Sequence, residues 1–212
     1  MRDQRVYNPP QAARFRTWRS TLLTFAVLVA PTFSKGEAAQ TYKVDPSNSS
    51  ITFEVRHMVV STVRGAFTEF EGELCGDDTT SSWTSLRATI QAASIDTHNN
   101  QRDRHLRSAE FFDVERFPHI EFLCSTITRR AGEWIARGRL SLHGVTQEIE
   151  FPITIAGPIT DPWGNSRLGI EATFMVRRQD YGISWNESLD NGGLVVGDEV
   201  WAHVNVEAVA PD

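Results

Sequence analysis

The densest group of chemically capable side chains lies between residues 94 and 107. Ser94, Asp96, His98 and His105 supply the hydroxyl, carboxylate and imidazole groups that a nucleophilic triad uses. Spacing along the chain does not establish a triad, and the sequence contains no Gly-x-Ser-x-Gly elbow. We therefore expect a binding protein rather than an enzyme.

The histidines and cysteines give little support to a metal site. None of the 6 histidines forms a His-x-x-x-His pair, and no Cys-x-x-Cys motif occurs. His98 and His105 are the closest two, and only a loop could bring them to one metal ion. We expect neither a metal nor another cofactor.

Basic side chains in the same segment match the chemistry of phosphate. Arg102, Arg104 and His105 could form a cationic rim for a pyrophosphate or phosphate headgroup, because guanidinium groups bind phosphate oxygens in pairs. The alternative is structural: neighbouring carboxylates would pair with the arginines and anchor the segment. The acids available for this are Asp96, Asp103, Glu110, Asp113 and Glu115.

The elements that must position these residues are strands. Apolar and polar residues alternate in at least seven segments after residue 50, which is typical of antiparallel sheets with one buried face. With residues 63–74 the pattern predicts eight strands, and residues 41–44 could add a ninth. The polar stretch 96–118 interrupts the series, and residues 99–108 within it are expected to form a short helix. Closure into a barrel would remove exposed edges, although two packed sheets remain an alternative.

The inward-facing residues decide whether such a barrel is filled or hollow. An eight-stranded barrel is just wide enough to fill with side chains or to hold one small ligand. Several inward positions carry alanine or glycine, which leaves space unless the small and large residues interlock. Phe67 and Phe70 have opposite parity, so we expect a bulge between them. The predicted lining residues are Phe53, Val55, His57, Phe67, Ile90, Phe122, Leu140, Phe151, Ile153 and Phe174. His57 would either lie near a headgroup or be an ordinary core histidine.

The first 38 residues differ from the rest of the chain. Five arginines precede a short apolar run, Leu22–Ala30, and small residues follow it. This layout is typical of a secretory signal, and the run is shorter than the roughly 20 residues that span a bilayer. We expect cleavage near Ala38, a single domain over residues 41–210, and a periplasmic or secreted protein with no integral membrane segment after cleavage.

Removal of the leader makes the protein strongly acidic. Taking its six basic and two acidic residues from totals of 21 and 27 leaves a formal net charge of −10. Such a surface repels phosphate backbones, so we expect no nucleic-acid partner. Export would permit a disulfide between Cys75 and Cys124, but two free thiols are at least as consistent with the strand pattern.

A set of motifs along the mature chain resembles the YceI-like family. The likeness runs from about Tyr42 to Val209, and its most specific block combines the 94–97, 102–108 and 111–118 segments. The motifs are Tyr-Lys-Val-Asp45, Ile51–His57, Gly65–Gly72, Ser94–Thr97, Arg102–Ser108, Phe111–Pro118, Gly138–Thr146 and Asp161–Gly164. The resemblance implies an all-β, extended, eight-stranded lipocalin-like barrel that binds a polyisoprenoid-type lipid. It supplies no catalytic residues, and it implies that a homodimer is possible.

Three functions follow from this reading. The first is an exported carrier or reservoir for an isoprenoid or quinone-type lipid, such as a polyprenyl phosphate, in transport, storage or stress response. The second is an enzyme acting on an isoprenoid or quinone lipid. The third is an interaction protein whose lipid is only structural.

Overall fold

Long antiparallel strands dominate the computed structural model, which describes residues 39–77, 82–188, 190 and 193–210. These residues belong to one compact unit, Glu37–Asp212, so the predicted signal segment lies outside the described part of the chain. The strands are β1 (Gln40–His57), β2 (Ser61–Phe67), β3 (Phe70–Asp77), β4 (Ser82–Gln91), β5 (Ile95–Asp96), β6 (His119–Arg130), β7 (Glu133–Leu142), β8 (Val145–Thr160), β9 (Ser166–Arg177) and β10 (Val196–Val209).

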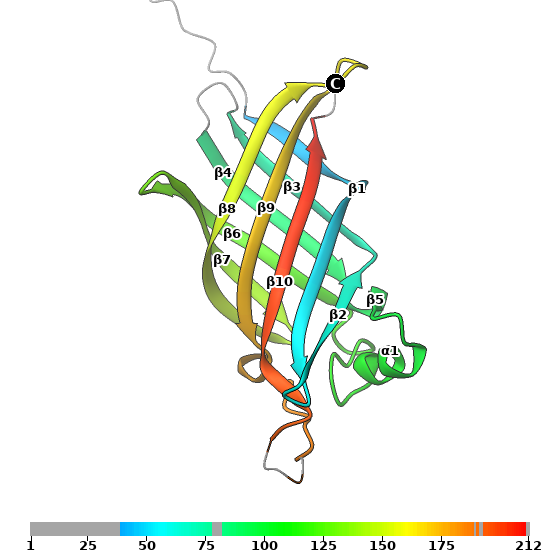
Figure 1. Cartoon of the computed structure of the whole chain (residues 1–212). Coiled ribbons are helices and arrows are strands. Elements are labelled where there is room, and N and C mark those ends of the chain that lie inside the picture. Colours follow the sequence, from blue (N-terminus) through cyan, green and yellow to red (C-terminus); the bar gives the residue numbers. More distant parts are fainter. Residues whose placement is uncertain (1–38, 78–81, 189, 191–192, 211–212) are drawn as a thin grey trace, which may run out of the picture. The chain divides into compact units, whose positions relative to one another are not determined.

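The sheet closes on itself. Neighbouring strands follow the order β10-β9-β8-β7-β6-β4-β3-β1, and β10 also pairs with β1, which completes an eight-stranded barrel (Figure 1). The predicted antiparallel barrel is therefore confirmed, and the alternative of two packed sheets is wrong. β2 and β5 add an extension beside the second half of β1.

A break in the second strand segment explains the parity of its two phenylalanines. β2 and β3 both run antiparallel to β1 and follow one another along it, with Thr68 and Glu69 between them. The interruption lets Phe67 and Phe70 both face the barrel interior, where each lines a cavity. The structure thus has a break between two strands where we expected a bulge. Residues 41–44 form no separate strand, because they belong to the continuous β1.

One end of the barrel is filled with side chains. Tyr42, Leu74, Ala136 and Ala208 are completely buried there, and the Tyr42 and Trp83 rings meet edge to face at 6.1 Å. At Gly138 an added Cβ would overlap the carbonyl oxygen of Leu123, so glycine is needed for close strand approach rather than to leave space. Side chains therefore fill the barrel interior around Tyr42 and Leu74.

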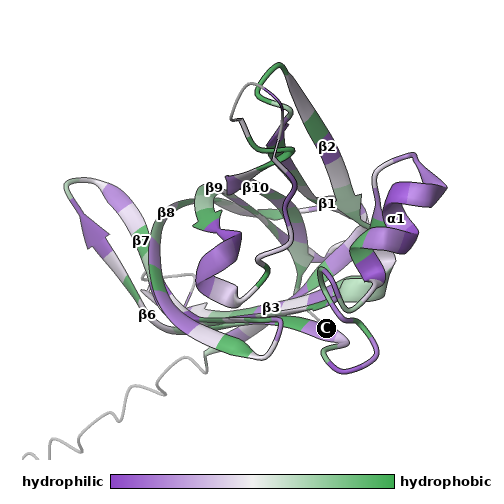
Figure 2. Cartoon of the chain, turned by 90° about the horizontal axis from the view of Figure 1, so that it is seen from below, coloured by the Kyte–Doolittle hydropathy of each residue, from purple (hydrophilic) through white to green (hydrophobic). Residues whose placement is uncertain are grey.

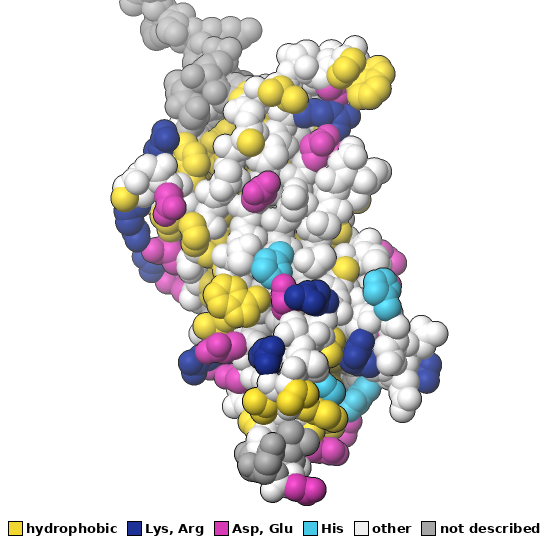
Figure 3. Space-filling model, viewed as in Figure 1, with side chains coloured by type: hydrophobic (Ala, Val, Ile, Leu, Met, Phe, Trp, Pro, Cys, Tyr) yellow, Lys and Arg dark blue, Asp and Glu magenta, His cyan; other side chains and the backbone are white. Residues whose placement is uncertain are grey.

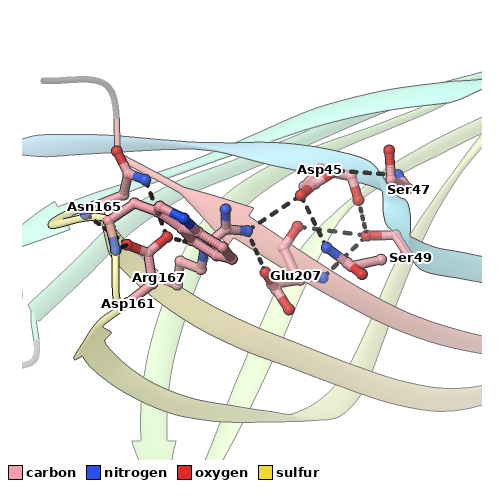
Figure 4. A network of polar contacts seen from close by, with 9 residues as sticks. Asp45, Ser47, Ser49, Asp161, Asn165, Arg167 and Glu207 are labelled. Carbon is pink, nitrogen blue, oxygen red and sulfur yellow. Dashed lines mark hydrogen bonds and ion pairs between the residues drawn. The ribbon is translucent and has the colours of Figure 1, made fainter.

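An ion-pair network fastens the same end (Figure 4). Arg167 donates to Asp161 at 2.6 Å and to Asp45 at 3.1 Å, and it also pairs with Glu207. These contacts join β1, β9 and β10 to the turn after β8. The hydrogen bond from Arg167 holds the pKa of Asp161 well below its usual range, with further donation from Asn165.

The opposite end carries the connections between strands. The 3-10 helix η1 (Ala92–Ser94), β5 and the helix α1 (Asn100–Arg107) lead from β4 to β6, and η2 (Arg178–Tyr181) follows β9. The Asn99 side chain caps α1 by accepting from the backbone N–H groups of Gln101 and Arg102. The helix expected at residues 99–108 is therefore confirmed.

Neither cysteine is part of a disulfide. Cys75 is half-buried beside Thr41, while Cys124 is buried and its pKa is raised by burial.

Among the described residues, no helix is long and apolar enough to cross a bilayer.

Candidate functional site

Two adjoining apolar cavities occupy the middle of the barrel. The inner cavity has a volume of about 110 Å³ and the outer one about 170 Å³. They are continuous in their walls, since six residues line both: Ile51, Ile90, Ile120, Leu140, Phe174 and Val204. The small residues Ala88, Ala172 and Ala202 also face these cavities. Short side chains in the middle of long strands therefore leave real space.

A third cavity lies at the end of the barrel that carries α1. It has a volume of about 400 Å³ and is lined by α1, β1, β2 and the segment before β10. Figure 2 looks into the barrel from this end and shows α1 and the connecting loops around it. The third cavity shares Phe53, Val55, Leu106, Phe111 and Val196 with the outer cavity. We call the three cavities together the channel, and the third one its mouth.

All ten residues predicted from strand parity line this channel. Phe122, Phe151 and Ile153 lie at the inner cavity, and Phe67 lies at the outer one. Ile90, Leu140 and Phe174 are shared by these two, Phe53 and Val55 by the outer cavity and the mouth, and His57 faces the mouth. Their contact with a ligand stays a prediction.

Aromatic rings give the channel wall its shape. Phe151 stacks on Phe174 with centroids 4.1 Å apart, and Phe122 approaches Phe151 at 5.2 Å. Nearer the mouth, Phe67 contacts Phe53 at 5.7 Å and Phe112 at 5.9 Å. Such a lining suits a long, thin hydrocarbon, because it offers area for apolar contact and few hydrogen-bonding groups.

The polar candidates for a headgroup site separate into two places. Arg102 and His105 line the mouth, where the His105 ring packs against Trp185 at 4.8 Å. Arg104 instead lines a different depression, together with Arg107 and Glu115. The structure therefore brings together two of the three predicted headgroup residues, and the headgroup role of this pair remains a prediction.

Carbonyl and hydroxyl oxygens, not carboxylates, accept the hydrogen bonds of Arg102 and Arg107 in the crossover. Arg102 donates to the carbonyl and hydroxyl oxygens of Thr97 at 2.8 and 2.7 Å. Arg107 donates to the carbonyl oxygens of Ala93 and Ile95 at 2.7 and 2.5 Å. The buried Asp103 accepts from the N–H and hydroxyl groups of Thr97. The expectation of a pinned segment therefore holds. Acid pairing contributes at Arg116–Asp113 and His105–Glu110, but not at Arg102 or Arg107.

Arg178 is a channel residue that the sequence analysis missed. It is only 4% exposed, lines the outer cavity, and donates to the carbonyl oxygens of Ile183, Trp185 and Gly197 at 2.8–2.9 Å. Burial lowers the pKa of Arg178, while the charge of Asp198 acts in the opposite direction. One signal could have revealed it, since the inward phase of β9 from Leu168 to Val176 continues to position 178.

Apolar residues outside the strands complete the channel. Leu106 and Phe111 come from the crossover, and Ile183 and Trp185 come from the segment after η2. No periodic pattern marks these residues, so strand parity could not have predicted them.

The side chains considered for catalysis make structural contacts. Ser94 donates its hydroxyl to the carbonyl oxygen of Gln91 at 2.7 Å, and His105 pairs with Glu110 at 2.6 Å. His98 is 92% exposed and lies 3.5 Å from Asp96. Across the described ranges, no three His, Cys, Asp or Glu side chains gather in a way that could hold a metal ion.

The closed barrel and its channel define the class of this protein: an extended, lipocalin-like antiparallel β-barrel with an apolar interior. The model of the YceI-like domain matches residues 42–208, and the chain belongs to the YceI-like family. It is 34% identical to protein YceI of Salmonella agona over 164 residues, which are 76% of this chain and 84% of that one.

Two solved structures share the fold. BcnA of Burkholderia cenocepacia superposes with a TM-score of 0.67 at 21% identity, over 77% of this chain and 98% of that chain. A polyisoprenoid binding domain from Saccharophagus degradans, implicated in plant cell wall breakdown, gives a TM-score of 0.63 at 14% identity. That alignment covers 81% of this chain and 99% of the other.

Proposed function

We propose that this protein binds one long-chain lipid of the polyisoprenoid type inside the channel. The observation that carries the proposal is the continuous series of three cavities between the filled end and the mouth. The likeness to a polyisoprenoid binding domain supports the same ligand class. The prenyl chain lies along the Phe122, Phe151 and Phe174 rings, and its polar end lies at the mouth near Arg102 and His105.

Apolar burial supplies the affinity. A micromolar dissociation constant corresponds to about 8 kcal/mol, which is the transfer free energy of roughly 330 Å² of apolar surface at about 25 cal/mol per Å². The lipid's prenyl chain must bury more than this area, because binding also costs translational and conformational freedom. A prenyl chain long enough to run through the channel meets this requirement.

The protein acts, on this proposal, as an exported carrier or reservoir rather than as an enzyme. The signal layout of residues 1–38 supports export with cleavage near Ala38. The intact mass of protein recovered from the cell envelope tests this part. A mass that still includes the leader would contradict cleavage.

Mass spectrometry of an organic extract tests the ligand. Protein purified from its native envelope should release a prenyl lipid in about one-to-one amount, whether a quinone or a polyprenyl phosphate. The blocked variants Phe122→Trp and Phe151→Trp should fold, since the added volume enters the cavity, and should release much less lipid. Leu123→Trp is the matched control, because Leu123 is the neighbouring residue and is 40% exposed.

The outcomes separate the possibilities. Full lipid recovery from a folded, blocked variant would refute the channel as the binding site. Recovery of no lipid from the wild type would refute the carrier function itself. Conversion of the extracted lipid by the pure protein would favour the enzyme alternative.

A further inference from the structure

The turn between β1 and β2 presents three consecutive apolar side chains to solvent. Met58, Val59 and Val60 are 42%, 59% and 83% exposed and form the whole connection between the paired residues His57 and Ser61. We call these three residues the apolar tip. Figure 3 shows apolar side chains gathered at this end of the molecule. Burial within the described fold does not account for their type.

The backbone of the apolar tip also disfavours these residues. Met58 and Val59 have φ angles of 50° and 65°. Tight hairpin turns with positive φ favour Asn and Gly, and a β-branched residue there is an outlier. The backbone conformation of the turn thus disfavours the residues that occupy it. We infer that their apolar character has a role other than forming the turn.

The apolar tip lies directly beside the mouth of the channel. The Met58 N–H donates to the Val195 carbonyl at 2.8 Å, and Leu194, the residue before Val195, is 45% exposed. Val195 and His57, the residue before Met58, both line the mouth. The exposed tip therefore adjoins the mouth, which in turn shares lining residues with the outer cavity.

We propose that the apolar tip and Leu194 insert into the surface of a phospholipid bilayer and place the channel mouth against it. The inference rests on the proposed function, because a cargo with a prenyl chain resides in a bilayer and must enter the channel without crossing water. The chain after the leader carries a net charge of −10, so an anionic lipid surface would repel it. The bilayer surface that it binds is therefore expected to be uncharged.

The other end of the barrel provides a matched comparison. Trp163, in the turn after β8, is 80% exposed, about as much as Val60 in the apolar tip. It lies at the filled end, next to the Asp161 network and away from the mouth. If exposed apolar surface alone caused membrane binding, Trp163 would contribute as much as the apolar tip does.

Sedimentation with uncharged phosphatidylcholine vesicles tests the proposal. The wild type is compared with the triple variant Met58→Asn/Val59→Gly/Val60→Ser and with Trp163→Ser. All three proteins are purified from the cell envelope of the same host, and their intact masses show that they share the same N-terminus. We expect the triple variant to lose about tenfold or more in vesicle partition, since several buried methylene equivalents are removed. Its Tm should not fall, because Asn and Gly accept the positive φ angles. Trp163→Ser should partition like the wild type.

The readouts keep the two proposals distinguishable. A triple variant that partitions like the wild type overturns the inference, and so does an equal loss in Trp163→Ser. A wild-type dimer that the triple variant abolishes in analytical ultracentrifugation would also overturn it, because the tip would then bind a second copy. Bound lipid is measured in parallel, so an empty channel counts against the proposed function alone.

Discussion

Arg178 places a buried positive charge at the wall of an apolar cavity. Its guanidinium group is held by carbonyl oxygens from the segment after η2 and from β10, and no carboxylate lies within ion-pair distance among the described residues. Hydrogen bonds from one rigid, planar group thus tie the backbone at Ile183, Trp185 and Gly197 to Arg178. The role is a positioning one, because the segment supplies Ile183 and Trp185 to the channel.

Arg178→Lys should destabilise the fold by about 2 kcal/mol, since lysine cannot direct donors to the same set of carbonyl groups and leaves buried acceptors unpaired. Urea unfolding measures the change. Arg177→Lys is the control, because the neighbouring Arg177 side chain is 57% exposed and pairs with Glu199 at 3.7 Å. Equal losses in both variants would contradict the role of Arg178.

The ion pair of Asp161 predicts how the free energy of unfolding depends on pH in acid. The pKa of Asp161 in the folded state is far below the ordinary value of 3.8, mainly because of the hydrogen bond from Arg167. A depressed carboxylate pKa adds stability that is fully present above the unfolded-state value and is lost as the pH falls toward the folded-state value. Stability should therefore decline as the pH drops below about 4.

Asp161→Asn should flatten this acid dependence while lowering stability at neutral pH. Urea unfolding midpoints between pH 6 and pH 2.5 check both effects. Glu69→Gln, at an exposed position, should leave the acid slope unchanged. A variant of Asp161 that keeps the wild-type slope would show that the network is not linked to acid unfolding.

At the level of elements, the crossover from β4 to β6 has little strand pairing, because only its two-residue β5 pairs with another strand, β2. The buried Asp103 on α1 accepts two hydrogen bonds from Thr97, and Leu106 and Phe111 extend from this segment into the channel. The crossover therefore closes part of the mouth, and its stability is local to a few hydrogen bonds.

Asp103→Ala should loosen the crossover without unfolding the barrel. Removing the carboxylate leaves the buried Thr97 N–H without an acceptor, at a cost of about 1–3 kcal/mol. Hydrogen exchange should accelerate at residues 97–118 and stay slow in β8, β9 and β10. Glu115→Ala, at an exposed position in the same segment, is the control. A uniform acceleration over all strands would show that the crossover is not a separate unit.

At the level of the whole molecule, one end of the barrel is solid and the other is hollow. Completely buried side chains and the Arg167 network stabilise the filled end, while apolar residues around the channel have no packing partner on one side. Empty apolar space costs packing energy. A ligand that fills it should stabilise the folded state in proportion to its occupancy.

Added prenyl lipid should therefore raise the Tm of protein from which bound lipid has been stripped. At a hundredfold excess over the dissociation constant, the linkage contributes about 2.7 kcal/mol. Differential scanning calorimetry measures the shift, and the Phe151→Trp variant should show little of it. An equal shift in the blocked variant would place the lipid outside the channel.

Alternation along the amino-acid sequence was enough to predict the barrel and most of its lining. Alternation along the strands fixes which side chains face inward, because the side-chain period of a strand is two. For this reason Phe53, Phe122, Phe151 and Phe174 could all be assigned to the interior before the structure was known. The helix was also predicted, over residues 99–108, because a polar and charged stretch interrupts the strand pattern there. The structure places it at Asn100–Arg107.

Only the tertiary structure decided where the barrel is filled and what surrounds its mouth. The approach of Met58 to Val195 and the hydrogen bond from Arg178 to the Gly197 carbonyl join residues that are distant in the chain. Arg102 and Arg104 face different cavities because of the way α1 lies against the barrel. These contacts form only when β1 pairs with β10 and when the irregular segments fold against the barrel. Neither the strand pairing nor the path of an irregular segment is marked by a repeating pattern of residues in the sequence. The residues around the mouth could therefore not be predicted from local sequence.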